Sequence, residues 1–380
     1  MDKSHTNASW GNRRVIVDKL SGMDLTLPEF RVLVEERLAQ SIDSLTWLVQ
    51  EEFDQVPHEE FLAPARLLLN SGKRTRAAFV LAGYQLATTS ACDPAATAGS
   101  AIELYQASAL VHDDVIDDSP TRRGNPAAHV AFTNLHTESR WLYSPADFGR
   151  ASAIVLGDLL LSEASKEFQA AAAMVTPREG TTAFRQFQAM CTEVAFGQYL
   201  DIRAEQQPLD RSQDAIASAL SVLRHKSANY SVQLPLVIGA QLGGGSDELI
   251  SQLRKLGGLL GEAFQMRDDD LGIFGEPSQT GKPSGGDITE GKRTILLALI
   301  REKAGARRDW LDSRLGTVLS DADISQLRTL AISCGARSEH EDMILAREDE
   351  ARLLLQTLDG NDDGIQTLAN LMHELAGRIA

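Results

Sequence analysis

Apolar residues recur at helical spacing along most of this chain. The first such stripe is formed by Val32, Leu33, Leu38, Ile42, Leu45 and Leu48. The same spacing predicts helices over residues 74–89, 94–117, 151–173, 181–203, 211–243, 247–273 and 291–304. More charged, amphipathic helices are expected near 308–317, 321–334, 339–358 and 363–379. Because alternating, strand-like patterns are rare, the sequence predicts an all-α protein.

The length of the chain and the absence of linkers predict one large domain. The chain has 380 residues, 43% of them hydrophobic, and no Ser/Gly-rich linker divides it. We therefore expect a loose N-terminal leader over 1–26 and a single large helical bundle over 27–380. The longest apolar helices should lie at its centre.

Two irregular segments interrupt the helical pattern. Residues 119–150 carry Pro120, Pro126 and Pro145 and are predicted to form a long connection. Residues 272–291 are rich in glycine and contain Lys282. A loop of this length between helices can be a plain linker, but a lid or binding loop is the interpretation we favour.

Charge and cysteine content exclude several classes of function. The net charge of -16 argues against binding to nucleic acid or to an anionic membrane face. The three cysteines are widely spaced and fit a reducing compartment. The first residues are polar, and no run of about 18 apolar residues is present to span a membrane. These features predict a cytoplasmic protein.

Two groups of aspartates each follow a long apolar segment. Asp113 and Asp117 are four residues apart and share a helix face, where like charges repel. Such a helix end is stabilised either by solvent or by a cation. A second group, Asp268 to Asp270, makes solvation alone a weaker explanation, because facing carboxylates would repel strongly. Bound Mg2+ would relieve that repulsion, and the spacing of a calcium loop is absent.

Basic residues accompany both acidic groups. Lys73 and Arg76 lie where a helix is predicted to begin, which is a favourable place for an anion. Arg122 and Arg123 follow the first aspartates, and Lys226 lies on another predicted helix. Each cation alone would be read as a surface charge. Together they indicate two kinds of phosphate site, one held by metal and one by direct Arg and Lys contacts.

These motifs, in this order, resemble those of the trans-prenyltransferases, the isoprenyl diphosphate synthases of the polyprenyl synthetase family. The motifs are Gly72-Lys73-Arg74-x-Arg76, Asp113-Asp114-x-x-Asp117 with Arg122-Arg123-Gly124, Gly157-Asp158, Gly197-Gln198, Phe264-Gln265-x-x-Asp268-Asp269, Gly281-Lys282 and Gly291-Lys292. The resemblance covers roughly residues 28–380 and is most like the bacterial geranylgeranyl diphosphate synthases. It implies an all-helical bundle around a central apolar cavity, usually as a homodimer.

The resemblance also implies a role for each motif residue. Up to roughly three Mg2+ ions would be held on an allylic diphosphate by Asp113, Asp114, Asp117, Asp268 and Asp269. The same diphosphate would be contacted by Arg122, Lys226, Ser227, Gln265 and Lys282, with Lys292 in the closing loop. Isopentenyl diphosphate would be bound by Gly72, Lys73, Arg76, Gln106 and Arg123. Ser227 stands where the family usually has threonine.

The second aspartate motif departs from the family pattern at its end. Gly272 stands where the family commonly has aspartate. Asp270 is no substitute, because on a helix it points about 200° away from Asp268. We therefore expect Asp268 to be the main ligand of this cluster. Ala77, where proline is common, is expected to be a detail of the helix start.

Product length is expected to depend on the helix before Asp113. Ser108 and Ala109 are small and lie one turn before the first aspartates, where enzymes that stop at fifteen carbons commonly have bulky residues. Tyr105 lies one turn of about 5.4 Å further back. It would form a floor that ends growth near twenty carbons, as in geranylgeranyl diphosphate. The alternative is that a partner helix forms the floor, with a farnesyl or longer product.

Three other functions fit the sequence less well. A terpene cyclase shares the fold and the first aspartate motif, but its second metal motif of Asn, Ser/Thr and Glu is not found on the late helices. A non-catalytic synthase subunit would typically lose the aspartates that are whole here. A purely structural metal-binding protein leaves the paired phosphate sites unexplained.

Overall fold

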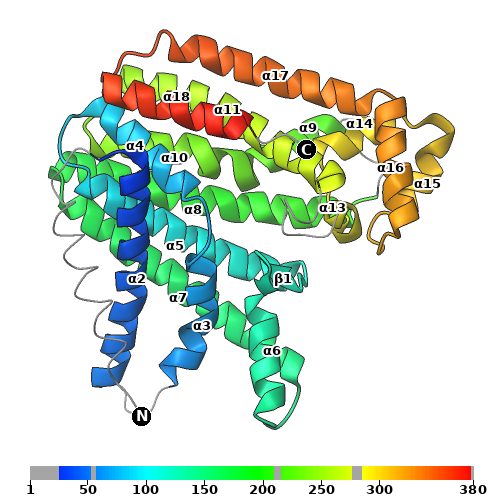
Figure 1. Ribbon diagram of the computed structural model, residues 1–380, viewed down its shortest axis with the longest axis horizontal. Helices are drawn as coiled ribbons and strands as arrows, with labels where there is room; N and C mark the ends of the chain where they lie inside the picture. Colours follow the sequence, from blue (N-terminus) through cyan, green and yellow to red (C-terminus); the bar gives the residue numbers. More distant parts are fainter. Residues whose placement is uncertain (1–24, 53–56, 209–214, 276–284, 378–380) are drawn as a thin grey trace. The chain divides into compact units, whose positions relative to one another are not determined.

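Helices form almost all of the regular structure of this protein (Figure 1). The computed structural model describes residues 25–377 apart from 53–56, 209–214 and 276–284. Within these residues the only strands are β1 (Thr121–Arg122) and β2 (Asn125–Pro126), which pair antiparallel. The all-α prediction is confirmed. The leader expected over 1–26 lies, up to residue 24, outside the described residues.

The chain divides into two compact units. Unit 1 comprises Met1–Phe184, Ile238–Ser246 and Asn361–Thr367, and unit 2 comprises Arg185–Val237, Asp247–Gly360 and Leu368–Ala380. Three helices contain residues of both units: α8 (Pro177–Gln206), α10 (Leu234–Leu242) and α18 (Asp362–Ala376). The single domain expected over 27–380 stays a prediction.

Unit 1 is built around α5 (Asp93–Ile116), whose residues are buried without a break from Pro94 to Ser108. The helix packs against α2 (Leu27–Glu52), α4 (Thr75–Ala87) and α7 (Pro145–Ala173). Small residues make this packing close, since a Cβ on Gly99 would lie only 2.9 Å from the Cβ of Ala77. The sequence is apolar on most sides here because α5 is enclosed on most sides.

The prediction of a long connection over 119–150 is wrong in part. The segment forms the β1–β2 hairpin and then α6 (Ala128–Glu138), and α7 begins at Pro145 rather than near 151. The prolines mark element boundaries instead of an open loop. Pro145 occupies the first turn of α7, where its missing N–H costs nothing, and Ser144 caps that helix by accepting a hydrogen bond from Asp147 N.

A further helix of unit 1 was not among those predicted. Helix α3 (His58–Leu69) contains Pro64 in its interior, which weakens the helical signal of the sequence. Its buried face carries Leu62, Ala65 and Leu69. The residues that follow α3 lead into the Ser71–Arg76 motif, so this helix fixes where that motif lies.

Unit 2 contains the second group of long helices. Helix α11 (Asp247–Phe274) packs against α17 (Ala336–Leu355) and against η2 (Leu223–Gln233), a π-helix that follows α9 (Ala215–Val222). Shorter elements complete the unit: α13 (Gly286–Glu290), α14 (Ile295–Lys303), η3 (Gly305–Arg307), α15 (Arg308–Asp312) and α16 (Asp321–Ser333). The buried apolar core of unit 2 includes Met266 of α11, Leu296 of α14 and Ile344 of α17.

The π-helix interrupts what the sequence predicted as one helix over 211–243. Glycines let its backbone lie unusually close to neighbouring helices. A Cβ on Gly261 would lie 2.5 Å from the carbonyl oxygen of Ala228, and one on Gly197 would lie 2.4 Å from the backbone nitrogen of Lys226. π-Helical geometry occurs frequently at functional sites, and this π-helix carries Lys226.

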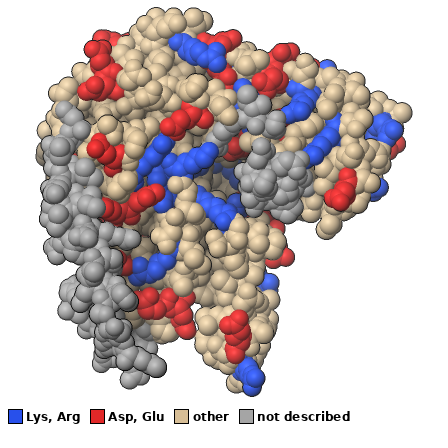
Figure 2. All heavy atoms as spheres, viewed as in Figure 1, with Lys and Arg blue, Asp and Glu red and all other residues tan. Residues whose placement is uncertain are grey.

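Charged side chains of both signs are spread over the face of the molecule that Figure 2 shows, without one continuous basic field. None of the helices in the described part of the chain is long and apolar enough to cross a membrane.

Candidate active site

The first acidic group ends α5 in unit 1. Asp113 lies in the last turn of α5, and Asp117 caps it, donating its backbone N–H to the carbonyl of Asp113 at 2.8 Å. Asp114 is buried, with an exposed fraction of 2%, whereas the side chain of Asp118 is 91% exposed. The four carboxylates are therefore not equivalent, and Asp118 is the one that solvent stabilises.

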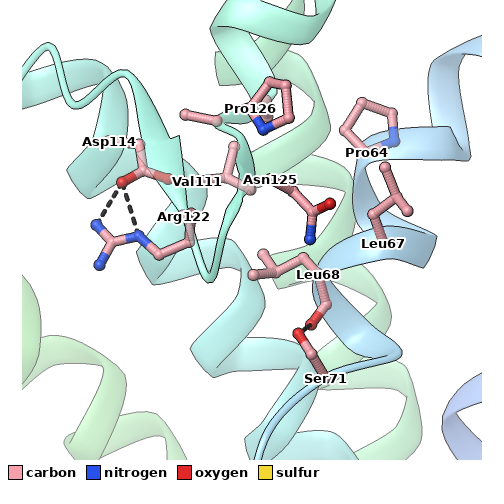
Figure 3. A pocket seen from close by; sticks show the side chains of 11 residues that line it. Pro64, Leu67, Leu68, Ser71, Val111, Asp114, Arg122, Asn125 and Pro126 are labelled. Carbon is pink, nitrogen blue, oxygen red and sulfur yellow. Dashed lines mark hydrogen bonds and ion pairs between the residues drawn. The ribbon is translucent and has the colours of Figure 1, made fainter. Parts of the chain in front are cut away.

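The hairpin after α5 returns Arg122 to this acidic group (Figure 3). Its Nε donates a hydrogen bond to Asp114 Oδ1 at 2.8 Å, its Nη2 contacts the same oxygen, and Nη2 lies 3.4 Å from Asp113 Oδ2. The turn is tight because Arg123 and Gly124 both adopt positive φ, at 53° and 78°. A two-residue turn of this kind matches the twist of the hairpin strands.

Arg123 lies on the other side of the same turn and contacts the segment between α3 and α4. Its Nη1 donates to Leu68 O at 3.0 Å and also contacts Ser71 O. A Cβ on Gly72 would lie 3.0 Å from that nitrogen, and Gly72 has a φ of 126° that side chains rarely adopt. The structure thus brings together Gly72 and Arg123, two residues of one predicted substrate site.

Positive charge is concentrated around Arg123. Burial and the nearby guanidinium groups of Arg74, Arg76 and Arg122 lower the pKa of Arg123, while Glu103 opposes the shift. Arg74 is itself buried and holds the motif in place, because its Nη1 donates to Ser71 O at 3.1 Å. Several cations forced together in this way would be relieved by an anion. Lys73 is exposed at the edge of this group.

A small pocket lies between the hairpin and α3. Leu67, Leu68 and Ser71 line one side of it, and Val111, Asp114 and Arg122 line the other (Figure 3). The pocket therefore borders both the acidic group and the segment that Arg123 contacts.

The second acidic group lies near the end of α11 in unit 2. Burial and the carboxylates of Asp287, Asp268 and Asp201 raise the pKa of Asp269 well above its usual range, while a hydrogen bond from Gln265 opposes the shift. Asp270 points elsewhere and accepts hydrogen bonds from Arg337 at 3.0 and 2.8 Å. This agrees with the prediction that Asp270 does not substitute for a carboxylate at position 272.

Lys226 approaches the second acidic group from the π-helix. Its Nζ contacts a carboxylate oxygen of Asp201 on α8, and both side chains are mostly buried. The neighbouring His225 Nδ1 lies 2.8 Å from Glu193 Oε1, which ties the π-helix to α8 again. Ser227 is half-buried beside Lys226. These ion pairs fix the direction in which Lys226 extends.

Sequence reasoning missed two carboxylates of this group, Asp201 and Asp287. Asp201 follows the Gly197-Gln198 pair by about one helical turn, so that motif offered a signal for it. Asp287 lies on α13 and comes near α11 only through the fold. No periodic pattern in the sequence could have shown this proximity.

The glycine-rich segment expected to form a lid is described only at its ends. Lys282 lies outside the described residues. The later end is anchored to unit 2: Gly285 N donates to Gly272 O at 2.9 Å, and Gly316 N donates to Ile288 O at 2.9 Å. The Nζ of Lys292 contacts Glu290 in the same short stretch.

The three residues expected to set product length lie on α5. Tyr105 is 6% exposed and Ser108 is 2% exposed, while Ala109 is half-buried. The Ser108 hydroxyl donates to Gly157 O on α7 at 2.7 Å, so its polar end is directed at the α7 backbone. Gln106, expected at the isopentenyl site, is buried on the same helix.

The residue types present suit Mg2+, although protein ligands alone do not form a closed site. In the described part of the chain, no three His, Cys, Asp or Glu side chains converge closely enough to hold a metal ion by themselves. Mg2+ is usually bound through one or two carboxylates together with waters and substrate phosphates. The crowded carboxylates around Asp269, beside Lys226, fit that mode of binding.

Comparison with known proteins gives consistent matches. A family model described as polyprenyl synthetase matches residues 58–330. A short chain isoprenyl diphosphate synthase of Methanothermobacter thermautotrophicus is 30% identical, over 78% of this chain and 80% of that protein. A nonaprenyl diphosphate synthase of Mycobacterium tuberculosis is 27% identical, over 88% of this chain and 90% of that protein. The chain is thus similar to proteins whose names give different product lengths.

A solved structure agrees in fold with most of the chain. A geranylgeranyl pyrophosphate synthase from Corynebacterium glutamicum, complexed with isoprenyl diphosphate and magnesium, is 33% identical with a TM-score of 0.86. The match covers 93% of this chain and 100% of that one.

Proposed function

The chain belongs to the polyprenyl synthetase family and is a prenyltransferase of isoprenoid synthesis, and on this premise we propose that it joins isopentenyl diphosphate to dimethylallyl, geranyl or farnesyl diphosphate. One observation carries the proposal. Adjacent arginines contact two different motifs, since Arg122 contacts Asp113 and Asp114 while Arg123 contacts the Ser71–Gly72 segment, and this supports two substrate sites. Two neighbouring sites for anions are what a reaction between two diphosphates requires.

We propose that the aspartates of the two acidic motifs hold Mg2+, which is supported by the similarity of the chain to a Corynebacterium enzyme solved in complex with magnesium. The residues are Asp113, Asp114 and Asp117 in unit 1, and Asp268 and Asp269 in unit 2. Bound Mg2+ would neutralise charge that develops on the departing diphosphate. Because Asp114 is already paired with Arg122, it acts in part by orienting that arginine.

The remaining site residues bind and orient the two substrates. Isopentenyl diphosphate is held by Gly72, Lys73, Arg76, Gln106 and Arg123, and the allylic diphosphate by Arg122, Lys226, Ser227, Gln265, Lys282 and Lys292. Cations around the allylic diphosphate stabilise it as its C–O bond breaks, which leaves an allylic cation. The isopentenyl double bond attacks that cation, forming the new C–C bond. A proton then leaves to the released diphosphate, so no protein nucleophile is needed.

We propose geranylgeranyl diphosphate as the main product. Ala109 and Ser108 are small, and Tyr105 lies one helical turn further from the aspartates on a fully buried stretch of α5. An additional turn of about 5.4 Å is close to the length of one isoprene unit. The experiment is to supply each allylic diphosphate with isopentenyl diphosphate and Mg2+ and to size the products after dephosphorylation. Elongation to about twenty carbons is expected.

A homodimer is the proposed state of the enzyme, which we expect in the cytoplasm. Helix α7 carries three exposed apolar side chains, Ile154, Val155 and Leu161, at 45%, 57% and 39%, and Ile154 and Leu161, seven residues apart, lie on one face. Apolar side chains repeated on one helix face are typical of a surface that another chain covers. Light scattering at assay concentrations measures this directly, and a monomer mass would contradict it.

A terpene cyclase is the alternative of the same fold. Incubation with geranylgeranyl diphosphate alone separates the two functions, because a synthase leaves that compound unchanged whereas a cyclase converts it to a hydrocarbon. The basic group around Arg123 favours the synthase, since a cyclase has no isopentenyl diphosphate to bind.

A further inference from the structure

The second acidic group lacks a carboxylate at Gly272, and the fold places another carboxylate at that position. A Cβ on Gly272 would lie 2.4 Å from Oδ2 of Asp287, closer than non-bonded atoms can approach. The Asp287 carboxylate therefore occupies the space that any side chain of residue 272 would need. Gly272 and Asp287 come from different helices, α11 and α13.

Helical geometry places this carboxylate on the face of α11 that carries Asp268. Residues four apart on a helix share a face, so position 272 lies directly beyond Asp268. The same rule places Asp269 next to Gln265, whose Nε2 lies 3.5 Å from Asp269 Oδ1. Asp270 lies on another side, where Arg337 holds it. Asp287 is thus on the side of α11 that carries the proposed metal ligand.

Several backbone contacts hold Asp287 in this place. Gly285 N donates to Gly272 O at 2.9 Å, which joins the start of α13 to the end of α11. Lys292 N donates to the carbonyl of Asp287 itself at 2.8 Å. The next residue, Ile288, is 2% exposed and belongs to the apolar core of unit 2. A carboxylate anchored on both sides is well suited to hold a ligand or to orient one.

We propose that Asp287 supplies, from α13, the carboxylate that α11 lacks at Gly272, and that it completes the second acidic group for binding a divalent metal. The inference rests on the proposed function for the identity of the metal site. It adds a residue to that site and explains the glycine, because any larger residue at 272 would displace the Asp287 carboxylate. The metal site then depends on the placement of α13.

The test moves the carboxylate back to α11. Four proteins are compared with the wild type: Asp287→Asn, Gly272→Asp, the double variant Gly272→Asp/Asp287→Gly, and Asp342→Asn as a matched control. Asp342 is exposed on α17, so its variant removes the same charge from the surface of the same unit. The readout is binding of Mn2+ in the presence of inorganic diphosphate, followed by electron paramagnetic resonance, which needs no turnover.

Asp287→Asn is expected to weaken Mn2+ binding roughly tenfold or more, as loss of a group that holds or orients a metal typically does. Gly272→Asp should weaken it also, because the two side chains compete for one space. The double variant should restore binding to within about threefold of wild type, and Asp342→Asn should bind as wild type does. Restoration by the double variant would show that a folding defect is not the cause.

Wild-type binding by Asp287→Asn, or a double variant no better than the singles, would overturn the inference. These outcomes are independent of whether the enzyme elongates prenyl chains. A wild-type protein that binds Mn2+ but forms no prenyl product would instead contradict the proposed function, and the comparison of variants would still decide the role of Asp287.

Discussion

Arg122 and Asp114 form a mostly buried ion pair in which two guanidinium nitrogens contact one carboxylate oxygen. Removing one member of such a pair leaves an uncompensated buried charge. Arg122→Met is therefore expected to lower the free energy of unfolding by about 3 kcal/mol. Urea denaturation at neutral pH measures this change.

A second variant separates stability from catalysis at the same pair. The double variant Arg122→Met/Asp114→Asn removes both charges and should recover most of the lost stability, because neither charge remains unpaired. Condensation should stay low in both proteins, since Arg122 is proposed to contact the allylic diphosphate. Full activity in the double variant would show that the pair is only structural.

Gly72→Ala should weaken binding of isopentenyl diphosphate and leave the allylic substrate unaffected. The added methyl group would lie 3.0 Å from Arg123 Nη1, and the φ of 126° is unfavourable for alanine. We expect the KM for isopentenyl diphosphate to rise about tenfold, equivalent to about 1.4 kcal/mol. Gly335→Ala is the control, because it has a φ of 79° with nothing within 4 Å. Equal effects of both variants on that KM would contradict this prediction.

Tyr105→Ala should lengthen the product if Tyr105 forms the floor of the chain-binding region. Its side chain is 6% exposed on α5, so removal also costs about 3 kcal/mol of stability, and folding must be checked. Ser108→Ala is the matched control. It removes only a hydroxyl that is bonded to Gly157 O, and the product length should not change. Chromatography of dephosphorylated products gives the answer, and unchanged lengths for Tyr105→Ala would exclude it as the floor.

Because His340 is buried, we predict that the free energy of unfolding depends on pH. Burial, together with the charges of Arg347, Arg267 and Arg337, lowers its pKa to about 4, against the opposing effect of Asp270. The folded protein keeps this imidazole neutral while the unfolded chain protonates it near its usual pKa. The stability that the neutral His340 contributes is therefore fully present above that usual pKa, and it is lost as the pH falls toward about 4.

Between neutral pH and about pH 5, the titration of His340 is expected to lower the free energy of unfolding by about 2 kcal/mol. His340→Gln removes the titration, so the difference in urea midpoint between the two pH values should be smaller in the variant. Other groups titrate equally in both proteins and cancel in the comparison. An identical pH dependence would show that folding does not change the pKa of His340.

The fold was predictable wherever burial is continuous along a helix. Residues 94–117 and 247–273 were predicted almost to their observed bounds, α5 at Asp93–Ile116 and α11 at Asp247–Phe274, because one face or more is enclosed along their whole length. The π-helix at Leu223–Gln233 was not predictable. It depends on close approach of backbones that Gly197 and Gly261 permit, which is a tertiary effect.

The candidate site also contains some residues that a local motif identifies and others that only tertiary packing brings in. Asp113, Arg122 and Arg123 are neighbours in the sequence, so a motif could identify them and a single tight turn brings the arginines into position. Asp201 and Asp287 reach the second acidic group from other helices. Asp201 could have been found from the Gly197-Gln198 motif one helical turn earlier, but the approach of Asp287 to α11 depends on packing that no local pattern encodes.

The measurement that tests the central claim most directly is chain elongation by wild type and Asp113→Ala in parallel. Each protein is incubated with isopentenyl diphosphate, Mg2+ and one allylic diphosphate, and the products are sized after dephosphorylation. Asp118→Asn is the control, because its 91% exposed side chain is expected to be dispensable. We predict elongation by wild type and Asp118→Asn, and a loss of at least about a hundredfold in Asp113→Ala with the helical content unchanged. Elongation by Asp113→Ala at a near-normal rate, or none by the wild type, would contradict the account.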